Sequence, residues 1–184
     1  MSRSLDLVIR NVRVVRPNKT SVDLLDVGVK DGRFTRLAPD IRPEEADEVI
    51  DGKNLLGFPG CVDAHMHVGI YQHVARDAVT ESKAAAMGGV TTSLNYFRTG
   101  QYYLNRGGPY REFMPELLRL SEGNFWVDYG YHLAPIEAGH IDEMDSLVTE
   151  WGVPSFKIFM FYGGYGLHGK SSSQNEFLMI GPDE

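Results

Sequence analysis

The feature that most constrains the fold is an alternation of strand-like and helix-like segments that starts after Phe58-Pro59-Gly60. Short apolar runs rich in β-branched and aromatic residues alternate with longer segments of helical composition. The predicted strands span residues 61–68, 90–97, 125–136 and 155–162, and the predicted helices span residues 76–87, 109–120 and 140–151. This alternation is typical of βαβ units around a parallel sheet. The sequence therefore predicts an α/β fold.

Four β/α units of this kind make up half of an eight-stranded barrel. Half a barrel leaves two parallel edges and an open core, which proteins avoid. We therefore expect the first half of a TIM-type (β/α)8 barrel, completed by a C-terminal half of the same protein as a continuation or as a separate chain. A four-stranded open sheet is the alternative.

The N-terminal part has a different pattern, with short β-branched segments and no helical period. Asp31-Gly32 predicts a hairpin turn, because glycine permits the positive φ that a two-residue turn needs. The predicted strands span residues 5–15, 23–29 and 33–37, with another short strand within residues 48–56. We therefore divide the chain into a small β-rich, sandwich-like module at residues 1–56 and an incomplete barrel at residues 57–184.

Charge and cysteine content exclude several classes of partner and compartment. The 184 residues carry a formal net charge of −7, which argues against nucleic acid or an anionic membrane surface as a partner. No segment approaches the roughly 20 apolar residues of a membrane span, and the N-terminus lacks the apolar core of a signal peptide. Cys61 is the only cysteine, so no internal disulfide can form. We expect a cytoplasmic protein.

The segment Asp63-Ala64-His65-Met66-His67 carries the first candidate site. Alternate residues of a strand point to the same face, so His65 and His67 are expected to project together. Two imidazoles at this spacing can bind one metal ion, and Zn²⁺ favours such nitrogen ligands. The pair lies towards the carboxyl end of its strand, where barrels place their active sites. The alternative is two histidines on a half-buried strand.

Lys157 is the second candidate, because it lies inside the very apolar run at residues 155–162. Burial disfavours the charged ammonium and lowers the pKa of lysine below its free value of about 10.4. A neutral amine can react with CO₂ to give a carbamate, whose two oxygens can bridge two cations. The alternative is a lysine whose ammonium reaches water from the end of a strand.

Four segments together resemble a known enzyme family. FPGCVDAHMHV (58–68), GGVTTSLNYF (88–97), VDYGYHLAPI (127–136) and SFKIFMFY (155–162) are similar, in order and spacing, to the cyclic-amide hydrolase branch of the amidohydrolase superfamily. The likeness is greatest to dihydropyrimidinases and hydantoinases and covers nearly the whole chain. It implies a homotetrameric enzyme that opens the C–N bond of a cyclic amide, such as a dihydropyrimidine, hydantoin or related imide, by a metal-bound hydroxide.

The resemblance also implies roles for single residues. His65 and His67 match the pair that binds the more buried of two divalent ions, and Lys157 matches the carboxylated lysine that bridges both. Tyr162 matches the tyrosine that hydrogen-bonds the substrate carbonyl and its developing oxyanion. Zn²⁺ is the expected metal, although mixed nitrogen and oxygen sites also accept Mn²⁺, Fe²⁺ or Co²⁺. Asp63 is expected to orient a ligand histidine or its strand as a hydrogen-bond acceptor.

Further ligands lie outside these residues according to the same resemblance. The family takes two more histidines and a catalytic aspartate from later strands, so we expect this chain to be inactive alone. Two functional alternatives stay open: a non-catalytic scaffold or assembly protein of the same fold, and a hydrolase of an acyclic N-acyl or carbamoyl compound.

The chain departs from the family pattern at two positions. Gly69 replaces the arginine that dihydroorotases and allantoinases carry after their histidine pair, and Asn95 replaces an aspartate that is usual in hydantoinases. Both departures leave the identity of the substrate open. Among the other histidines, we interpret His132 as a core residue bonded to backbone, with a position lining the pocket as the alternative, and His140 as solvent-exposed.

Overall fold

The computed structural model describes residues 3–100 and 103–158 of the chain, and they form two compact units with the boundary between Pro59 and Gly60. No helix within these ranges has the length and apolar character needed to cross a membrane.

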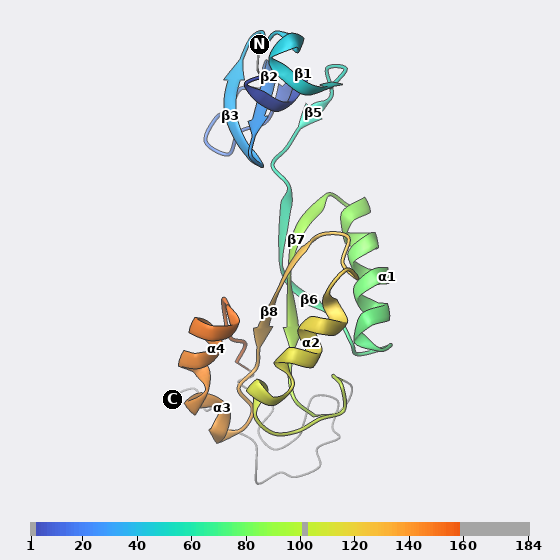
Figure 1. Ribbon diagram of the computed structural model, residues 1–184, viewed down its shortest axis with the longest axis vertical. Helices are drawn as coiled ribbons and strands as arrows, with labels where there is room; N and C mark the ends of the chain where they lie inside the picture. The colour runs from blue at the N-terminus through green and yellow to red at the C-terminus, as the bar shows by residue number, and fades with distance from the viewer. Residues whose placement is uncertain (1–2, 101–102, 159–184) are drawn as a thin grey trace. The chain divides into compact units, whose positions relative to one another are not determined.

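The N-terminal unit is a five-stranded sheet, as its predicted β character requires (Figure 1). The elements are β1 (Leu5–Val14), β2 (Asp23–Lys30), β3 (Arg33–Ala38), the 3₁₀ helix η1 (Pro43–Glu45), β4 (Ala46–Asp51) and β5 (Leu56–Gly57). The strand order is β3-β2-β1-β4, and β5 pairs with β1. The β1–β2 and β2–β3 pairs are antiparallel, whereas β4 and β5 run parallel to β1.

A buried carboxylate fixes the irregular middle of this sheet. The ladder between β1 and β2 shifts register between Ile9 and Val12, and Asn11 within the shift has a φ of 55°. Asp26, which is 2% exposed, accepts hydrogen bonds from the backbone N–H of Asn11 at 2.9 Å and of Ile41 at 2.8 Å. Asp26 therefore satisfies two backbone donors that the sheet ladder leaves without partners.

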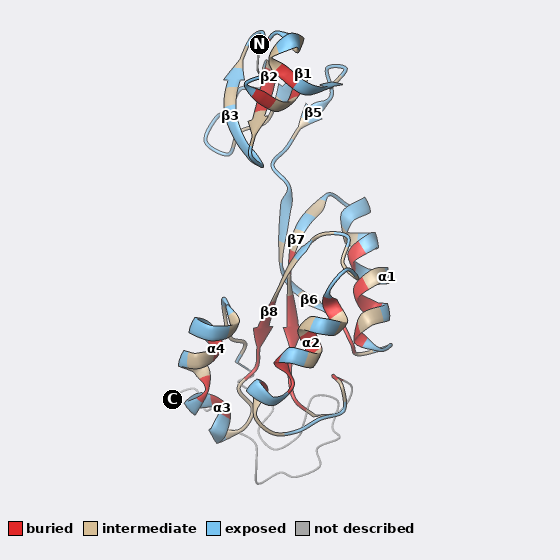
Figure 2. Cartoon of the chain, viewed as in Figure 1, coloured by how far each residue is buried: buried red, intermediate tan, exposed pale blue. Residues whose placement is uncertain are grey.

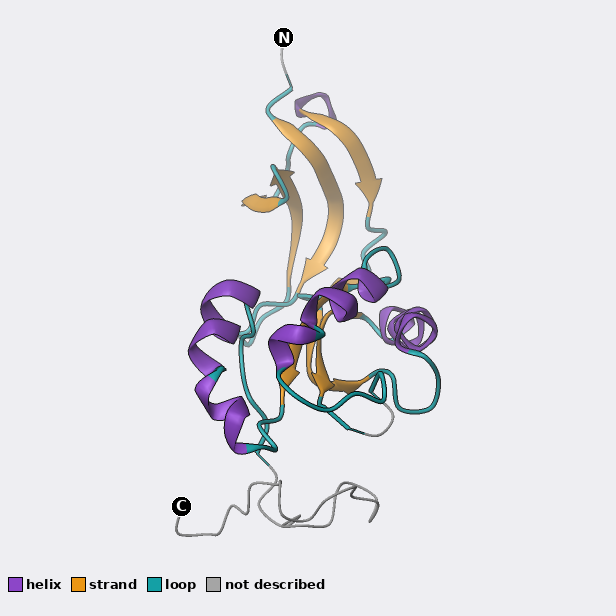
Figure 3. Ribbon diagram, turned by 60° about the horizontal axis from the view of Figure 1, so that its bottom comes forward, coloured by secondary structure: helices purple, strands orange, loops and turns teal. Residues whose placement is uncertain are grey.

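The second unit is built on a parallel sheet of three strands in the order β6-β7-β8. Figures 1 and 3 show helices α1 and α2 beside this sheet, with α3 and α4 on the side of β8. The elements are β6 (Cys61–His67), α1 (Val74–Met87), β7 (Val90–Phe97), η2 (Tyr110–Glu112), α2 (Met114–Ser121), β8 (Asp128–Leu133), α3 (Ala138–Asp142) and α4 (Met144–Trp151). The predicted alternation of strands and helices is confirmed, although β8 is shorter than expected and the third helix is divided in two.

The fourth predicted strand is represented by one β-bridge within the described residues. Phe156 pairs in parallel with Leu133, and the backbone N–H of Lys157 donates to the carbonyl of Leu133 at 2.8 Å. The chain at Phe156 therefore lies beside β8, where the next strand of a barrel belongs. The rest of the predicted run, residues 159–162, lies outside the described residues.

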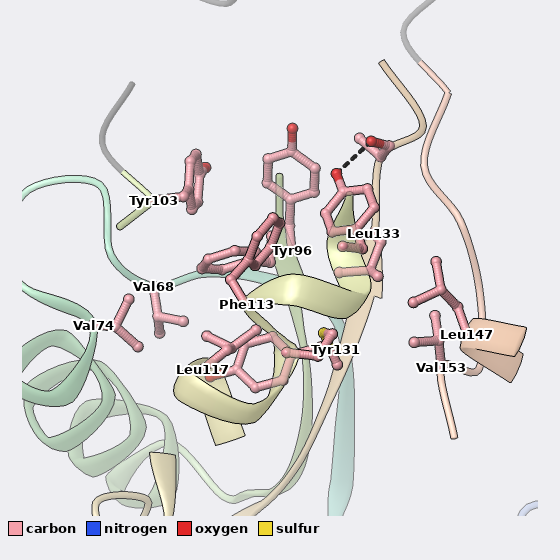
Figure 4. Packing of buried hydrophobic residues seen from close by; sticks show 14 residues of the cluster. Val68, Val74, Tyr96, Tyr103, Phe113, Leu117, Tyr131, Leu133, Leu147 and Val153 are labelled. Atoms are coloured by element: carbon pink, nitrogen blue, oxygen red, sulfur yellow. Dashed lines mark hydrogen bonds between the residues drawn. The ribbon is translucent and has the colours of Figure 1, made fainter. Parts of the chain in front are cut away.

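Aromatic residues dominate the core of the second unit. Figure 2 shows that buried residues in β7 and β8 gather towards the carboxyl ends of the strands. Figure 4 shows Tyr96 and Tyr103 with Phe113 and Leu117 of the same cluster. Trp126, near the amino end of β8, is by contrast 64% exposed. The packed end of the sheet is therefore the end at which the candidate site residues lie.

Candidate metal centre

The register of the parallel sheet brings the predicted residues to one edge. His67 at the end of β6 pairs with Tyr96 of β7, and Tyr96 pairs with His132 of β8. Because Leu133 pairs with Phe156, Lys157 lies two positions beyond this row. Parallel strands end at the same edge of their sheet, so four segments far apart in the sequence contribute to one place.

The three predicted metal-site residues meet there through their side chains. The Nε2 atoms of His65 and His67 lie 3.1 Å apart, and the Nζ atom of Lys157 lies 3.0 Å from Nε2 of His65. The β6–β7 ladder is irregular between Asp63 and Met66, so strict alternation along β6 is interrupted at this site. Irregularities of this kind next to active sites re-aim side chains.

The other nitrogen of each imidazole is held by a different part of the chain. Nδ1 of His65 lies 2.8 Å from Nε2 of His132, and Nδ1 of His67 lies 3.1 Å from the hydroxyl of Tyr103. Our interpretation of His132 as bonded to backbone is therefore wrong, since its ring contacts a predicted ligand. Sequence reasoning missed Tyr103 altogether, because no local pattern marks one tyrosine of a loop as the partner of a distant histidine.

Tyr96 forms an aromatic wall behind these groups. Its ring is buried, with its centroid 4.8 Å from that of His67 and 5.7 Å from that of His65. The ammonium nitrogen of Lys157 lies 5.2 Å from the centroid of the same ring, within the range of a cation–π contact. The buried ring of Tyr96 therefore covers one side of this group of nitrogens.

The electrostatic environment favours neutral nitrogens. Partial burial lowers the pKa of His65, and the nearby Lys157 ammonium lowers it further. Burial also lowers the pKa of His132, with added effects from His65 and Lys157. Burial alone lowers the pKa of Lys157. Each shift increases the fraction of nitrogens with a lone pair, which is the form that binds a cation or attacks CO₂.

The donor set fits a metal ion in part. Two imidazole nitrogens bound to one tetrahedral Zn²⁺ at about 2.0–2.1 Å would lie about 3.3 Å from each other, close to the 3.1 Å between the Nε2 atoms of His65 and His67. Among the described residues, no group of three His, Cys, Asp or Glu side chains is arranged to hold a metal ion. The described residues therefore offer two imidazoles and one amine, and a metal ion held by them would need further ligands.

The remaining predicted site residues have separate positions. A carboxylate oxygen of Asp63 accepts a hydrogen bond from the backbone N–H of His65 at 3.0 Å, so this side chain contacts the strand that carries the histidines. Tyr162 lies outside the described residues. His140, expected to be exposed, is buried: Nδ1 accepts from the backbone N–H of Ile136 and Nε2 donates to the carbonyl of Gly108. Its role is to hold loops together.

The two departures from the family pattern have local physical causes. Gly69 has a φ of 84°, and a Cβ atom there would lie 2.6 Å from Cγ2 of Val74, so an arginine does not fit this backbone. Asn95 is fully buried, and its amide nitrogen donates to the carbonyls of Ser93 and Gly130 at 3.3 and 3.2 Å. A carboxylate cannot donate these bonds, so the local structure selects the amide.

Known proteins are similar to this chain in sequence and in fold. The D-hydantoinase of Ralstonia pickettii is 30% identical over 168 residues, which are 89% of this chain and 35% of that protein. The D-hydantoinase of Streptomyces coelicolor is 36% identical over 150 residues, covering 76% of this chain and 30% of that protein. The chain belongs to the hydantoinase-like amidohydrolases. No family model matches it.

The solved structures extend the likeness to the fold. The crystal structure of dihydropyrimidinase from Brevibacillus agri matches the hydantoinase-like chain with a TM-score of 0.69 and 27% identity, over 91% of this chain and 35% of that protein. The chain thus spans about a third of the length of the relatives that it matches. The predicted fold, the first part of a TIM-type barrel preceded by a small β module, is confirmed.

Proposed function

We propose that the protein carrying this chain is a binuclear metal-dependent hydrolase that opens the C–N bond of a cyclic amide. A dihydropyrimidine, a hydantoin or a related imide is the substrate class that the names of its relatives support. The observation that carries the proposal is the meeting of His65, His67 and Lys157 from two distant strands, with their nitrogens about 3 Å apart.

The two histidines would hold one divalent ion through their Nε2 atoms, and Zn²⁺ is the metal that this chemistry favours. The neutral amine of Lys157 would add to CO₂, forming one N–C bond and releasing one proton. The resulting carbamate has two oxygens, which suit it to join two cations. When bound, the ions would supply a water of lowered pKa and polarise the amide carbonyl.

The rest of the protein would complete this site. Two further histidines and an aspartate from later strands would add ligands and a base, and Tyr162 would donate a hydrogen bond to the developing oxyanion. A homotetramer in the cytoplasm is part of the same proposal. On this proposal the 184 residues would be inactive by themselves, because the site needs ligands in addition to His65, His67 and Lys157.

The deciding experiment uses the purified full-length protein. It would be incubated with dihydrouracil and with a series of 5-substituted hydantoins, and the open-chain N-carbamoyl products would be quantified. The same assay would follow chelator treatment and then addition of Zn²⁺, Mn²⁺ or Co²⁺, with bound metal measured in every sample. We expect ring opening that is lost with the metal and restored by its return.

Undiminished ring opening by the metal-free protein would reject the mechanism. A folded protein that binds no metal and opens no ring would support a scaffold instead. Turnover confined to acyclic N-acyl or N-carbamoyl compounds in a parallel panel would move the function to that class.

A further inference from the structure

Tyr103 lies on a loop that leaves the carboxyl end of β7 and closes on itself. Gly100 pairs with Arg106 in an antiparallel bridge, and the backbone N–H of Gly100 donates to the carbonyl of Arg106 at 2.6 Å. Leu104 and Asn105 have φ values of 61° and 52°, which turn the chain sharply next to the tyrosine. The loop thus carries Tyr103 back onto the sheet.

Three consecutive residues of the chain hold the ring of Tyr103. The ring centroids of Tyr96 and Phe97 lie 5.5 and 5.3 Å from that of Tyr103, both in edge-to-face geometry. The guanidinium carbon of Arg98 lies 5.3 Å from the same ring. Tyr103 is only 2% exposed, so its hydroxyl has a defined position. Edge-to-face and cation–π contacts both stabilise this position of the ring.

That hydroxyl meets His67 on the side of the ring away from His65. The oxygen of Tyr103 lies 3.1 Å from Nδ1 of His67, whereas Nε2 of His67 points to Nε2 of His65. A neutral histidine that binds metal through one nitrogen carries its proton on the other, and a group that accepts a hydrogen bond from this N–H fixes the tautomer and the ring orientation.

We propose that Tyr103 is a positioning residue for His67: its hydroxyl oxygen accepts a hydrogen bond from Nδ1–H, so that the Nε2 lone pair faces the metal. This inference rests on the metal site of the proposed function and adds to it a residue from outside the ligand-bearing strands. His132 holds Nδ1 of His65 in the same way. With both Nδ1 atoms protonated, two Nε2 lone pairs face each other 3.1 Å apart. Nζ of Lys157, 3.0 Å from Nε2 of His65, or a cation bound beside the two nitrogens would offset the repulsion between the lone pairs.

The test is the substitution Tyr103→Phe in the full-length protein. The variant keeps the ring and its contacts with Tyr96, Phe97 and Arg98, and it removes only the hydroxyl. Zn²⁺ affinity of the metal-free protein would be measured by competition with a chromophoric chelator. Loss of an outer hydrogen bond to a ligand histidine costs about 10- to 100-fold in metal affinity, and we expect a loss in that range.

Tyr131→Phe is the matched control. Tyr131 is also a buried tyrosine of this unit, and its hydroxyl bonds to the Ser121 hydroxyl at 2.6 Å, with no contact to a predicted ligand. We expect this variant to keep the wild-type metal affinity. The visible spectrum of Co²⁺ bound to each protein gives a second reading, which we expect to change for Tyr103→Phe and to stay constant for Tyr131→Phe.

The outcomes separate this inference from the function on which it rests. If the wild-type protein binds no metal, or if His67→Ala binds as well as wild type, the metal site itself is rejected. If His67→Ala loses metal while Tyr103→Phe retains wild-type affinity and spectrum, the metal site stands and the role of Tyr103 is rejected. Equal losses for Tyr103→Phe and Tyr131→Phe would reduce Tyr103 to a packing residue.

Discussion

Nδ1 of His65 lies 2.8 Å from Nε2 of His132, although the two residues are 67 positions apart in the sequence and belong to different strands. His140 is also buried, but its ring nitrogens bond to backbone groups of two loops. Burial therefore does not distinguish the two histidines, whereas their partners do. One supports a predicted metal ligand, and the other supports the fold.

This difference predicts opposite effects for one substitution. His132→Leu in the full-length protein removes the acceptor for Nδ1–H of His65, and we expect Zn²⁺ affinity to fall about 10- to 100-fold. His140→Leu leaves buried backbone groups without partners, and we expect a loss of about 1–3 kcal/mol in the free energy of unfolding. Chelator competition measures the first effect and denaturant unfolding the second.

Each variant also serves as the control for the other. Metal affinity should be unchanged in His140→Leu at a temperature where it is folded. Full metal affinity in His132→Leu would show that the contact with His65 has no supporting role.

Lys157→Ala should abolish ring opening, because no carbamate can form at that position. We expect turnover at least about 100-fold below wild type, in line with removal of a group that binds both ions. Short carboxylic acids such as acetate or propionate should restore part of the activity, since their two oxygens can replace those of the carbamate. The measurement is turnover against carboxylate concentration.

Lys83→Ala is the matched control, because Lys83 is an exposed lysine of α1 whose ammonium lies 6.0 Å from the Trp126 ring. It should keep wild-type turnover and show no response to carboxylate. An active Lys157→Ala protein would contradict the proposed bridging role.

Asn95→Asp should destabilise the second unit at neutral pH. The carboxylate would face the carbonyls of Ser93 and Gly130, which now accept from the amide. Burial and these acceptors would raise the pKa of the new carboxyl group, so the loss should be largest above that pKa and shrink as pH falls and the group becomes a donor. We expect a loss of about 1–3 kcal/mol at pH 7.

Urea unfolding of wild type and Asn95→Asp across pH 4–8 would measure this effect. Asn95→Ser removes the same donor without adding charge and should show a loss that does not vary with pH. A pH-independent loss in Asn95→Asp would contradict the argument.

Much of the fold could be predicted because its signals are local. The Asp31-Gly32 turn, the alternation of strands and helices, and the pairing of His65 with His67 all depend on residues close in sequence. The position of Lys157 beside them follows once a parallel sheet is assumed, since parallel strands end at one edge.

The groups around the ligands could not be predicted in the same way. Tyr103 reaches His67 only because its loop closes through the bridge between Gly100 and Arg106. The partners of His132 and His140 likewise depend on which segments pack together. Their sequence neighbourhoods indicate a core histidine and an exposed one, but neither neighbourhood identifies the side chain or loop that the folded chain brings to the ring.

Asp26 makes the stability of the N-terminal unit sensitive to acid. Burial opposes its charge, but hydrogen bonds from the backbone N–H groups of Ile41 and Asn11 and from Arg10 outweigh this and lower the pKa of the carboxyl group. A lowered pKa in the folded state adds stability that is complete above the unfolded pKa of about 3.9 and is lost as pH falls through the folded pKa. Below about pH 4 the unit should therefore weaken progressively.

The substitution Asp26→Asn tests this directly, because it keeps the shape and removes the charge. We expect it to destabilise the unit by about 1–3 kcal/mol at pH 7. We also expect the free energy of unfolding to change less between pH 5 and pH 2 than it does in the wild type. Hydrogen exchange at the Asn11 and Ile41 amides reports on this unit alone. Asp40→Asn is the control, since Asp40 pairs with the same Arg10 but is exposed, and exposed pairs contribute at most about 1 kcal/mol. If Asp26→Asn loses stability with falling pH as much as the wild type does, carboxylates other than Asp26 cause the acid sensitivity of the unit.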